Sequence, residues 1–153
     1  LEYGASEDVA IAALLHDAVE DCGGLATAAQ IRALFGEAVE RLVLEESDSV
    51  VSTPEAKAPW RERKEAWLAR LETASPDAAL IAGCDKLDNA TSLASALLAG
   101  DCGILAKFKG GSDGIVWYFR SIVEILARRG CPCANDLADA VERLAGLIKR
   151  IIE

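Results

Sequence analysis

The sequence predicts an all-α protein of six to seven helices with no sheet. Apolar residues recur at helical spacing along most of the chain, and Val and Ile fall within these periods, not in alternating runs bounded by turns. Glycines, prolines and capping residues separate the periodic stretches. Because 153 residues is the size of one typical domain, we expect a single compact domain over residues 1–153.

The N-terminal part of the chain is expected to hold three helices. Ser6 is a good N-cap for the first helix, over residues 7–21. Thr27 opens a short second helix that Gly36 ends, and a third helix follows over residues 37–46.

The rest of the chain is expected to hold the longer helices. Residues 47–59 are rich in Ser, Thr, Asp and Pro and predict a loop, followed by a fourth helix over 60–72. Ser75 and Pro76 supply the cap and the first-turn proline of a fifth helix that reaches Leu98.

The remaining glycines and apolar periods predict the last two helices. Five glycines between 100 and 114 predict a flexible connection. The sixth helix covers residues 113–129, and Asn135 caps a last helix whose apolar residues keep the helical period.

Composition excludes two classes of partner. The chain has 25 acidic and 16 basic residues, a formal net charge of −9, and no basic stripe for a nucleic acid. Its longest apolar run, Val9–Leu15, is far shorter than the ~20 residues of a membrane span. We therefore expect neither nucleic acid nor membrane as a partner, whereas a homo-oligomer stays open.

The five cysteines are an odd number, and we expect no secretory signal before them. They predict reduced thiols in a cytoplasmic protein. Cys131-Pro132-Cys133 suggests a metal or redox pair, but it is one residue short of C-x-x-C, which favours a plain loop. The chain has no methionine and begins Leu1-Glu2-Tyr3, so we expect further residues upstream.

Two helices pass abruptly from apolar to acidic sequence. His16, Asp17, Glu20 and Asp21 follow the Val9–Leu15 run, with two i,i+4 pairs among them. A helix that is apolar on all sides is expected to be buried, and carboxylates that emerge from it need a partner or a cation.

A second acidic stretch follows the apolar residues 78–84. Asp85, Asn89 and Ser92 share one helical face there. Imidazole together with carboxylates suits Mn, Fe or Zn better than Ca. Two interpretations stay open from spacing alone, which are a metal site and ordinary helix-end caps with ion pairs.

Several motifs together resemble a known family. His16-Asp17-Ala18-Val19-Glu20-Asp21 is similar to the HD-x-x-ED signature of HD-domain metal-dependent phosphohydrolases, and residues 85–93 resemble its D-K-L-x-N-x-x-x-L segment. Residues 31–39 and 62–64 resemble its I-x-x-x-F-G-x-x-V and E-R-K segments, in the same order. The closest resemblance is to the RelA/SpoT hydrolase domain and the small stand-alone ppGpp hydrolases.

The resemblance implies a role for each matching residue. It implies that His16, Asp17 and Asp85 bind one divalent metal, most often Mn²⁺, and that Glu20 and Asp21 handle the water and its protons. It places Asn89 and Ser92 at the nucleotide. Two further residues are candidates for substrate contact, Lys86 and Tyr118, with a surface or structural ion pair as the open alternative for Lys86.

The family's first metal ligand is a histidine upstream of the HD pair, and His16 is this chain's only histidine. The resemblance therefore implies an N-terminally truncated HD domain in which the metal binds weakly or is absent. The implied reaction is removal of the 3′-pyrophosphate from guanosine tetra- or pentaphosphate or a similar nucleotide. The alternatives are an HD phosphohydrolase of another phosphorylated small molecule and a non-catalytic nucleotide-binding HD domain.

Overall fold

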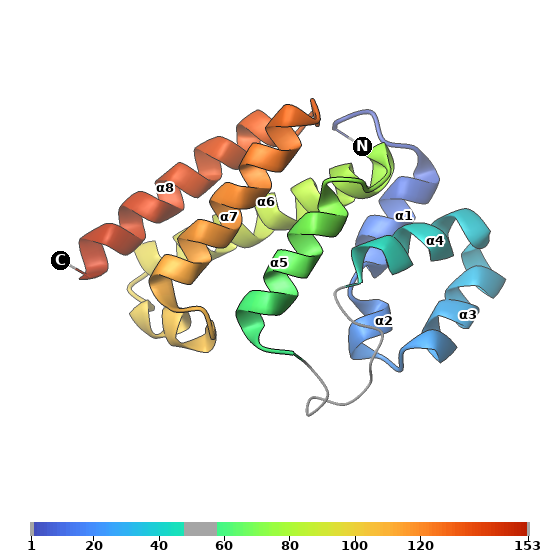
Figure 1. Ribbon diagram of the computed structural model, residues 1–153, viewed down its shortest axis with the longest axis horizontal. Coiled ribbons are helices and arrows are strands. Elements are labelled where there is room, and N and C mark those ends of the chain that lie inside the picture. The colour runs from blue at the N-terminus through green and yellow to red at the C-terminus, as the bar shows by residue number, and fades with distance from the viewer. Residues whose placement is uncertain (1, 48–57, 153) are drawn as a thin grey trace. The chain divides into compact units, whose positions relative to one another are not determined.

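The computed structural model describes residues 2–47 and 58–152, and over these residues it is all-α, with helices and no strand (Figure 1). The expected fold class is confirmed. The chain divides into two compact units, Leu1–Ala82 and Gly83–Glu153, with the division inside one helix. None of the helices in the described part of the chain is long and apolar enough to cross a membrane.

In its described residues, 2–47 and 58–82, the first unit contains five helices and the start of a sixth. They are α1 (Glu7–Leu15), α2 (Ala18–Asp21), α3 (Leu25–Phe35), α4 (Glu37–Glu46), α5 (Trp60–Leu71) and the first turns of α6 (Pro76–Leu98). The bounds of α4, α5 and α6 agree with the predicted ones, whereas α3 begins at Leu25 after Gly24, so Thr27 lies inside it and does not open it. The greater part of the predicted 47–59 loop, residues 48–57, lies outside the described residues.

The expected single helix over 7–21 is wrong, because the chain breaks at His16 and Asp17. Ser6 caps α1 as predicted, by accepting a hydrogen bond from the amide of Val9 at 3.4 Å. In a continuous helix the Ala13 carbonyl would accept the Asp17 amide. The His16 imidazole Nδ1 bonds this carbonyl at 2.9 Å, which offers the backbone an alternative to the next helical turn.

The expectation that α1 is buried on every side is also wrong. Val9 and Ala12 are buried, but Leu14 is 86% exposed. Helix α1 packs against α4, so one of its faces meets the core of this unit and the face that carries Leu14 does not. The apolar run thus marks a helix with one buried stripe.

The core of the first unit joins residues from α1, α2, α3, α4 and the start of α6. Its buried members are Val9, Ala12, Val19, Ala28, Ile31, Val39, Leu42, Val43, Ala78 and Ile81. Two polar contacts tie the later helices to the end of α4. Ser75 donates its hydroxyl to Glu45 at 2.8 Å, and the Trp67 indole donates to the Glu46 carbonyl at 3.4 Å. Ser75 also caps α6 as predicted, accepting from the Ala78 amide.

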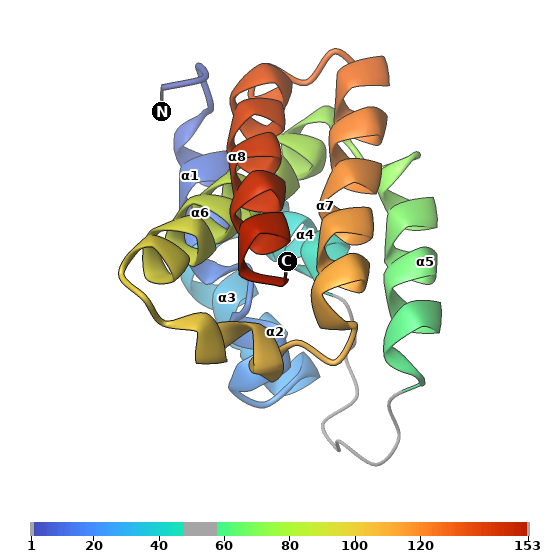
Figure 2. The same cartoon turned by 90° about the vertical axis from the view of Figure 1, so that its left-hand side faces the viewer.

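The second unit contains the rest of α6, the 3₁₀ helix η2 (Cys102–Lys107), α7 (Gly111–Arg128) and α8 (Ala134–Ile152). Helices α7 and α8 lie side by side, as both views show (Figure 2). Their buried side chains follow the predicted periods, with Ile115, Phe119, Ile122 and Leu126 on α7 and Leu137, Val141, Leu144 and Ile148 on α8.

Two expectations for the second unit are corrected. The connection between α6 and α7 contains η2, whose short i,i+3 turns the glycine-rich sequence did not predict. Asn135 lies inside α8 and does not cap it, because α8 begins at Ala134.

We expect Gly83→Ala to destabilise the protein by about 1–3 kcal/mol, the usual cost of overpacking a core. A Cβ at Gly83 would lie 2.3 Å from the Cys133 sulfur and 3.1 Å from Leu126 Cδ1. Gly146 in α8 is the matched control, since a Cβ there meets nothing within 4 Å. Gly146→Ala should be neutral or stabilise by up to ~1 kcal/mol through helix propensity. Urea unfolding of both variants measures the difference, and equal stabilities would contradict the close packing at Gly83.

Candidate functional site

The predicted metal ligands His16 and Asp17 lie in the turn between α1 and α2. The ring atom His16 Nε2 is 3.1 Å from Asp17 Oδ2, and the opposite ring atom Nδ1 is 2.9 Å from the Ala13 carbonyl oxygen. A carbonyl only accepts hydrogen bonds, so Nδ1 carries a proton. This backbone bond fixes the ring and its tautomer, as second-shell partners do for metal-binding histidines.

The Nε2 atom of His16 and the Oδ2 atom of Asp17 are both possible metal donors. With a proton on Nδ1, the neutral ring has its lone pair on Nε2, and a carboxylate oxygen is a lone-pair donor as well. Their separation of 3.1 Å suits an ion pair with a protonated ring and also two donors that share one cation. Two donors that each lie ~2.1 Å from one ion at a right angle are ~3.0 Å apart. The pair thus fits a divalent metal in the chemistry of its donors and in their spacing.

Glu20 and Asp21 lie on the short helix α2, directly after this pair. The Asp21 amide donates to the Asp17 carbonyl at 3.0 Å, so the chain keeps α-helical spacing from Asp17 onwards. Glu20 is half-buried and Asp21 is exposed. Both carboxylates are thus held on the turn that follows the predicted ligands.

Burial does not explain the acidic residues of the first cluster. The Asp17 side chain is 68% exposed, whereas the His16 side chain is 24% exposed. Asp17 therefore does not emerge from a helix that is buried on all sides, as the sequence predicted, because α1 has an exposed face. A metal at this pair is supported by the ring orientation and the donor spacing.

The second predicted cluster lies on α6 in the second unit. The Asp85 side chain is 15% exposed and forms an ion pair with Lys86 through Oδ2. The Asn89 amide donates to the other oxygen, Oδ1, at 2.7 Å. Lys86 thus forms an ion pair, which is the alternative to a substrate contact that the sequence left open for this residue. Asn89 thus contacts Asp85, a predicted metal ligand, and helps to hold its carboxylate in place.

The other two predicted substrate residues differ in exposure. Ser92 is exposed on α6, and Tyr118 is buried in α7 with 7% of its surface accessible. Tyr118 packs beside neighbouring aromatic rings of the same helix. Contact of either residue with a substrate stays a prediction.

The structure brings His16 to Asp17 within the first unit, and Asp85 to Lys86 and Asn89 within the second. Over residues 2–47 and 58–152, no three His, Cys, Asp or Glu side chains form a group suited to a metal. The convergence of His16, Asp17 and Asp85 on one ion therefore stays a prediction.

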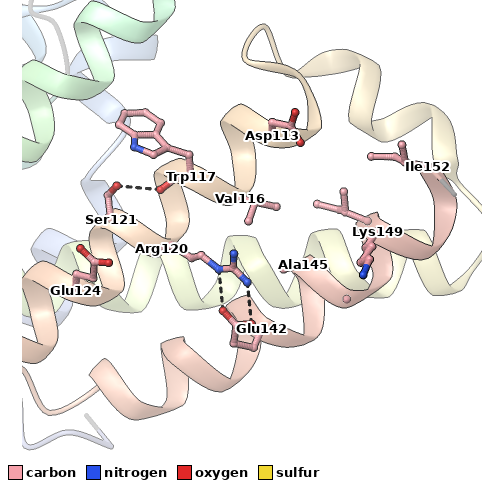
Figure 3. A pocket seen from close by; sticks show the side chains of 12 residues that line it. Asp113, Val116, Trp117, Arg120, Ser121, Glu124, Glu142, Ala145, Lys149 and Ile152 are labelled. Atoms are coloured by element: carbon pink, nitrogen blue, oxygen red, sulfur yellow. Dashed lines mark hydrogen bonds and ion pairs between the residues drawn. The ribbon is translucent and has the colours of Figure 1, made fainter.

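An open groove lies between α7 and α8 in the second unit, with a volume of about 940 Å³ (Figure 3). Arg120 and Glu142 span it through two hydrogen bonds of 2.9 Å, which raise the pKa of Arg120 and lower that of Glu142. Trp117 and Lys149 also line it. Because both partners of the ion pair are exposed, it adds little stability. The sequence gives no local signal for this pair, since its members are 22 positions apart.

An all-α fold with a His-Asp pair at a helix break, followed by a Glu-Asp pair, defines an HD-type domain. The HD domain family model matches residues 1–101, and the chain belongs to this family. HD domains are in general metal-dependent phosphohydrolases that bind divalent metals.

One solved structure is similar over almost the whole chain. It is the crystal structure of lmo0812 from Listeria monocytogenes EGD-e, with 31% sequence identity and a TM-score of 0.79. The match covers 95% of this chain and 92% of that chain. No curated protein matches the sequence.

Proposed function

We propose that this HD domain is a metal-dependent hydrolase that removes the 3′-pyrophosphate from guanosine tetra- or pentaphosphate or a similar nucleotide. The observation that carries the proposal is the His16–Asp17 pair, with a ring nitrogen and a carboxylate oxygen 3.1 Å apart and the ring fixed by the Ala13 carbonyl. Family membership supports the reaction class. The order of the sequence motifs supports the substrate class.

His16, Asp17 and Asp85 would hold the metal, with Mn²⁺ as the proposed ion. When bound, such an ion lowers the pKa of a coordinated water and polarises a phosphoryl oxygen. The contacts of Asp85 with Lys86 and Asn89 fix its carboxylate, and such outer contacts orient metal ligands. In the proposed site Lys86 also balances the negative charge of the second cluster.

Glu20 and Asp21 would handle the proton of the attacking water. They follow the His16–Asp17 pair by less than two turns, and the backbone bond from Asp21 to Asp17 holds α2 at that distance. A positioned carboxylate that takes a proton from water acts as a general base. The half-buried Glu20 is the better-shielded of the two and is the proposed base.

The exposed face of α6 would contact the nucleotide. Asn89 and Ser92 are exposed one and two turns after Asp85. Their amide and hydroxyl groups suit hydrogen bonds to a ribose or base, which select a ligand by leaving groups unpaired when the ligand lacks its partner.

The test is hydrolysis by the whole chain with saturating Mn²⁺ and a panel of substrates. The panel holds guanosine tetraphosphate, guanosine pentaphosphate, GTP, a nucleoside monophosphate and a sugar phosphate, and the products are resolved as pyrophosphate or phosphate. Release of pyrophosphate from the first two supports the proposal. Release of phosphate from another member favours the broader phosphohydrolase. Nucleotide binding without any release favours a non-catalytic domain, and either of these results contradicts the proposal.

We expect Asn89→Ala to raise KM for guanosine tetraphosphate about 10-fold, because a buried ligand group loses its hydrogen-bond partner. The 2.7 Å bond to Asp85 adds a second effect, a weaker metal site, which a Mn²⁺ titration separates from the change in KM. Ser95→Ala is the control on the same helix, since its hydroxyl donates to the Thr91 carbonyl. Equal KM values for the wild type and Asn89→Ala would show that the nucleotide does not use this face.

A further inference from the structure

A cluster of three cysteines lies in the second unit, in the loop between α7 and α8 and on the facing residues of α6. The sulfur atoms of Cys131 and Cys133 are 3.5 Å apart, and Cys84 forms a hydrogen bond with Cys133. The proposed hydrolase reaction gives these three thiols no role. The pattern Cys131-Pro132-Cys133 is thus a motif with a defined geometry that the hydrolase proposal leaves unexplained.

The local structure holds the two sulfur atoms together. Cys131 donates its amide to the Leu126 carbonyl at 2.9 Å and accepts the Ala134 amide at its own carbonyl, which fixes the turn that joins α7 to α8. Gly83 on α6 has no side chain, and this leaves room for the Cys133 sulfur, 2.3 Å from where a Cβ would lie. The Cys133 thiol is therefore packed against the backbone of α6.

The two thiols differ in access and in acidity. Cys131 is half-buried and Cys133 is fully buried, so a reagent in solution meets Cys131 first. The hydrogen bond from Cys133 lowers the pKa of Cys131 to about 7, with help from the positive charge of Arg129 and against the effect of burial. The hydrogen bonds to Cys131 and Cys84, together with burial, raise the pKa of Cys133. A thiolate is the reactive form of cysteine, so Cys131 is the nucleophile of the pair.

We propose that Cys131 and Cys133 are a reversible oxidation site, at which a hydroperoxide converts the two thiols into a Cys131–Cys133 disulfide. The Cα atoms of two residues with one residue between them, such as Cys131 and Cys133, are at most ~7 Å apart. A turn shortens this distance into the ~4.4–6.8 Å between Cα atoms that a disulfide bridges. The sulfurs need to approach by only ~1.5 Å from their present contact to reach a bond of ~2.05 Å.

The reaction takes place in two balanced steps. The Cys131 thiolate attacks one peroxide oxygen, the O–O bond breaks, and the leaving oxygen takes up a proton, so that Cys131 becomes a sulfenic acid. The Cys133 thiol then attacks the Cys131 sulfur, the S–O bond breaks, and the thiol proton passes to the departing hydroxyl, which leaves as water while the disulfide forms. Two electrons pass from the two thiols to one peroxide. A small dithiol reverses the change by thiol–disulfide exchange.

The test is a pulse of hydrogen peroxide on the whole chain, followed by alkylation, trypsin and mass analysis. Cleavage after Arg129 and Arg143 gives one peptide, residues 130–143, that contains both cysteines. We expect this peptide to become two hydrogens lighter and to lose both alkylation sites, with full recovery after dithiothreitol. This measurement needs no metal, no nucleotide and no hydrolase activity, so its outcome is independent of the proposed function.

Three variants assign the steps. Cys131→Ser should abolish oxidation of this peptide, whereas Cys133→Ala should leave a Cys131 sulfenic acid that dimedone traps. Cys102→Ser, which removes an exposed thiol of the same unit, should change neither result. A wild-type peptide that keeps both thiols while Cys102 is oxidised would overturn the proposal. A Cys84–Cys133 disulfide in place of the proposed one would overturn it as well.

Discussion

Glu20→Gln should lower kcat by about 10²–10⁴-fold while the bound metal is retained, because loss of a positioned general base has effects of this size. Glutamine keeps the shape and hydrogen-bonding groups of the side chain and removes only the basic carboxylate. Glu20 is half-buried on α2, directly after the His16–Asp17 turn, so an isosteric change disturbs the packing of Val19 least. Pyrophosphate release at saturating Mn²⁺ and nucleotide measures the effect.

Glu7→Gln is the matched control for this prediction. Glu7 is exposed in the first turn of α1, and the same isosteric change there should leave kcat unaltered. Near-normal turnover of Glu20→Gln would identify Glu20 as a structural acid and exclude it as the base. Loss of the metal together with turnover would instead place Glu20 among the metal ligands.

Asp17→Asn should lower the affinity for the metal by more than ~100-fold, since loss of an outer partner of a metal ligand alone costs ~10–100-fold in affinity. The charged oxygen that lies 3.1 Å from His16 Nε2 becomes neutral in this variant, and the cation loses one of its donors. Turnover should fall with metal occupancy and should recover in part at very high Mn²⁺. Metal analysis by calorimetry and the rate of pyrophosphate release are measured on the same preparation.

The control for the second prediction is Asp8→Asn, an exposed carboxylate in the first turn of α1. It tests whether a lower negative charge alone weakens Mn²⁺ binding. Equal losses in Asp8→Asn and Asp17→Asn would mean that the ion responds to the acidic surface as a whole. That result would contradict a site at the His16–Asp17 pair.

The helix bounds that depend on local signals were predicted well from the sequence. Helix α4 begins after Gly36 and ends at Glu46 as predicted, and Ser75 and Pro76 start α6 where the capping pattern placed its first turn. These signals are local because a cap or a positive-φ glycine acts on its own turn. Gly36 has a φ of 94°, which explains why the chain breaks there between two helices.

The break in the first predicted helix depends on a contact that helical periodicity does not record. The His16 side chain competes with the backbone amide of Asp17 for the Ala13 carbonyl, and the apolar period continues through this position. Burial of a side chain on α1 depends on whether another helix packs against its face, so the apolar run could not predict that Leu14 is 86% exposed.

The candidate site was predictable where spacing in the sequence brings residues together. Neighbours such as His16 and Asp17, and i,i+4 partners such as Asp85 and Asn89, make the contacts that their spacing allows. The pairing of Arg120 with Glu142 across α7 and α8 has no such signal. The contact between Cys133 and Gly83 likewise joins segments that are far apart in the sequence.

The most direct test of the account is whether residues of both units bind the same divalent ion. Mn²⁺ titration followed by electron paramagnetic resonance measures this for the wild type, Asp17→Asn and Asp85→Asn, with Asp88→Asn as the control for an exposed carboxylate on α6. We predict one weak Mn²⁺ site whose dissociation constant rises more than ~100-fold in Asp17→Asn and at least ~10-fold in Asp85→Asn. An unchanged dissociation constant in Asp85→Asn, beside a loss of binding in Asp17→Asn, would contradict it.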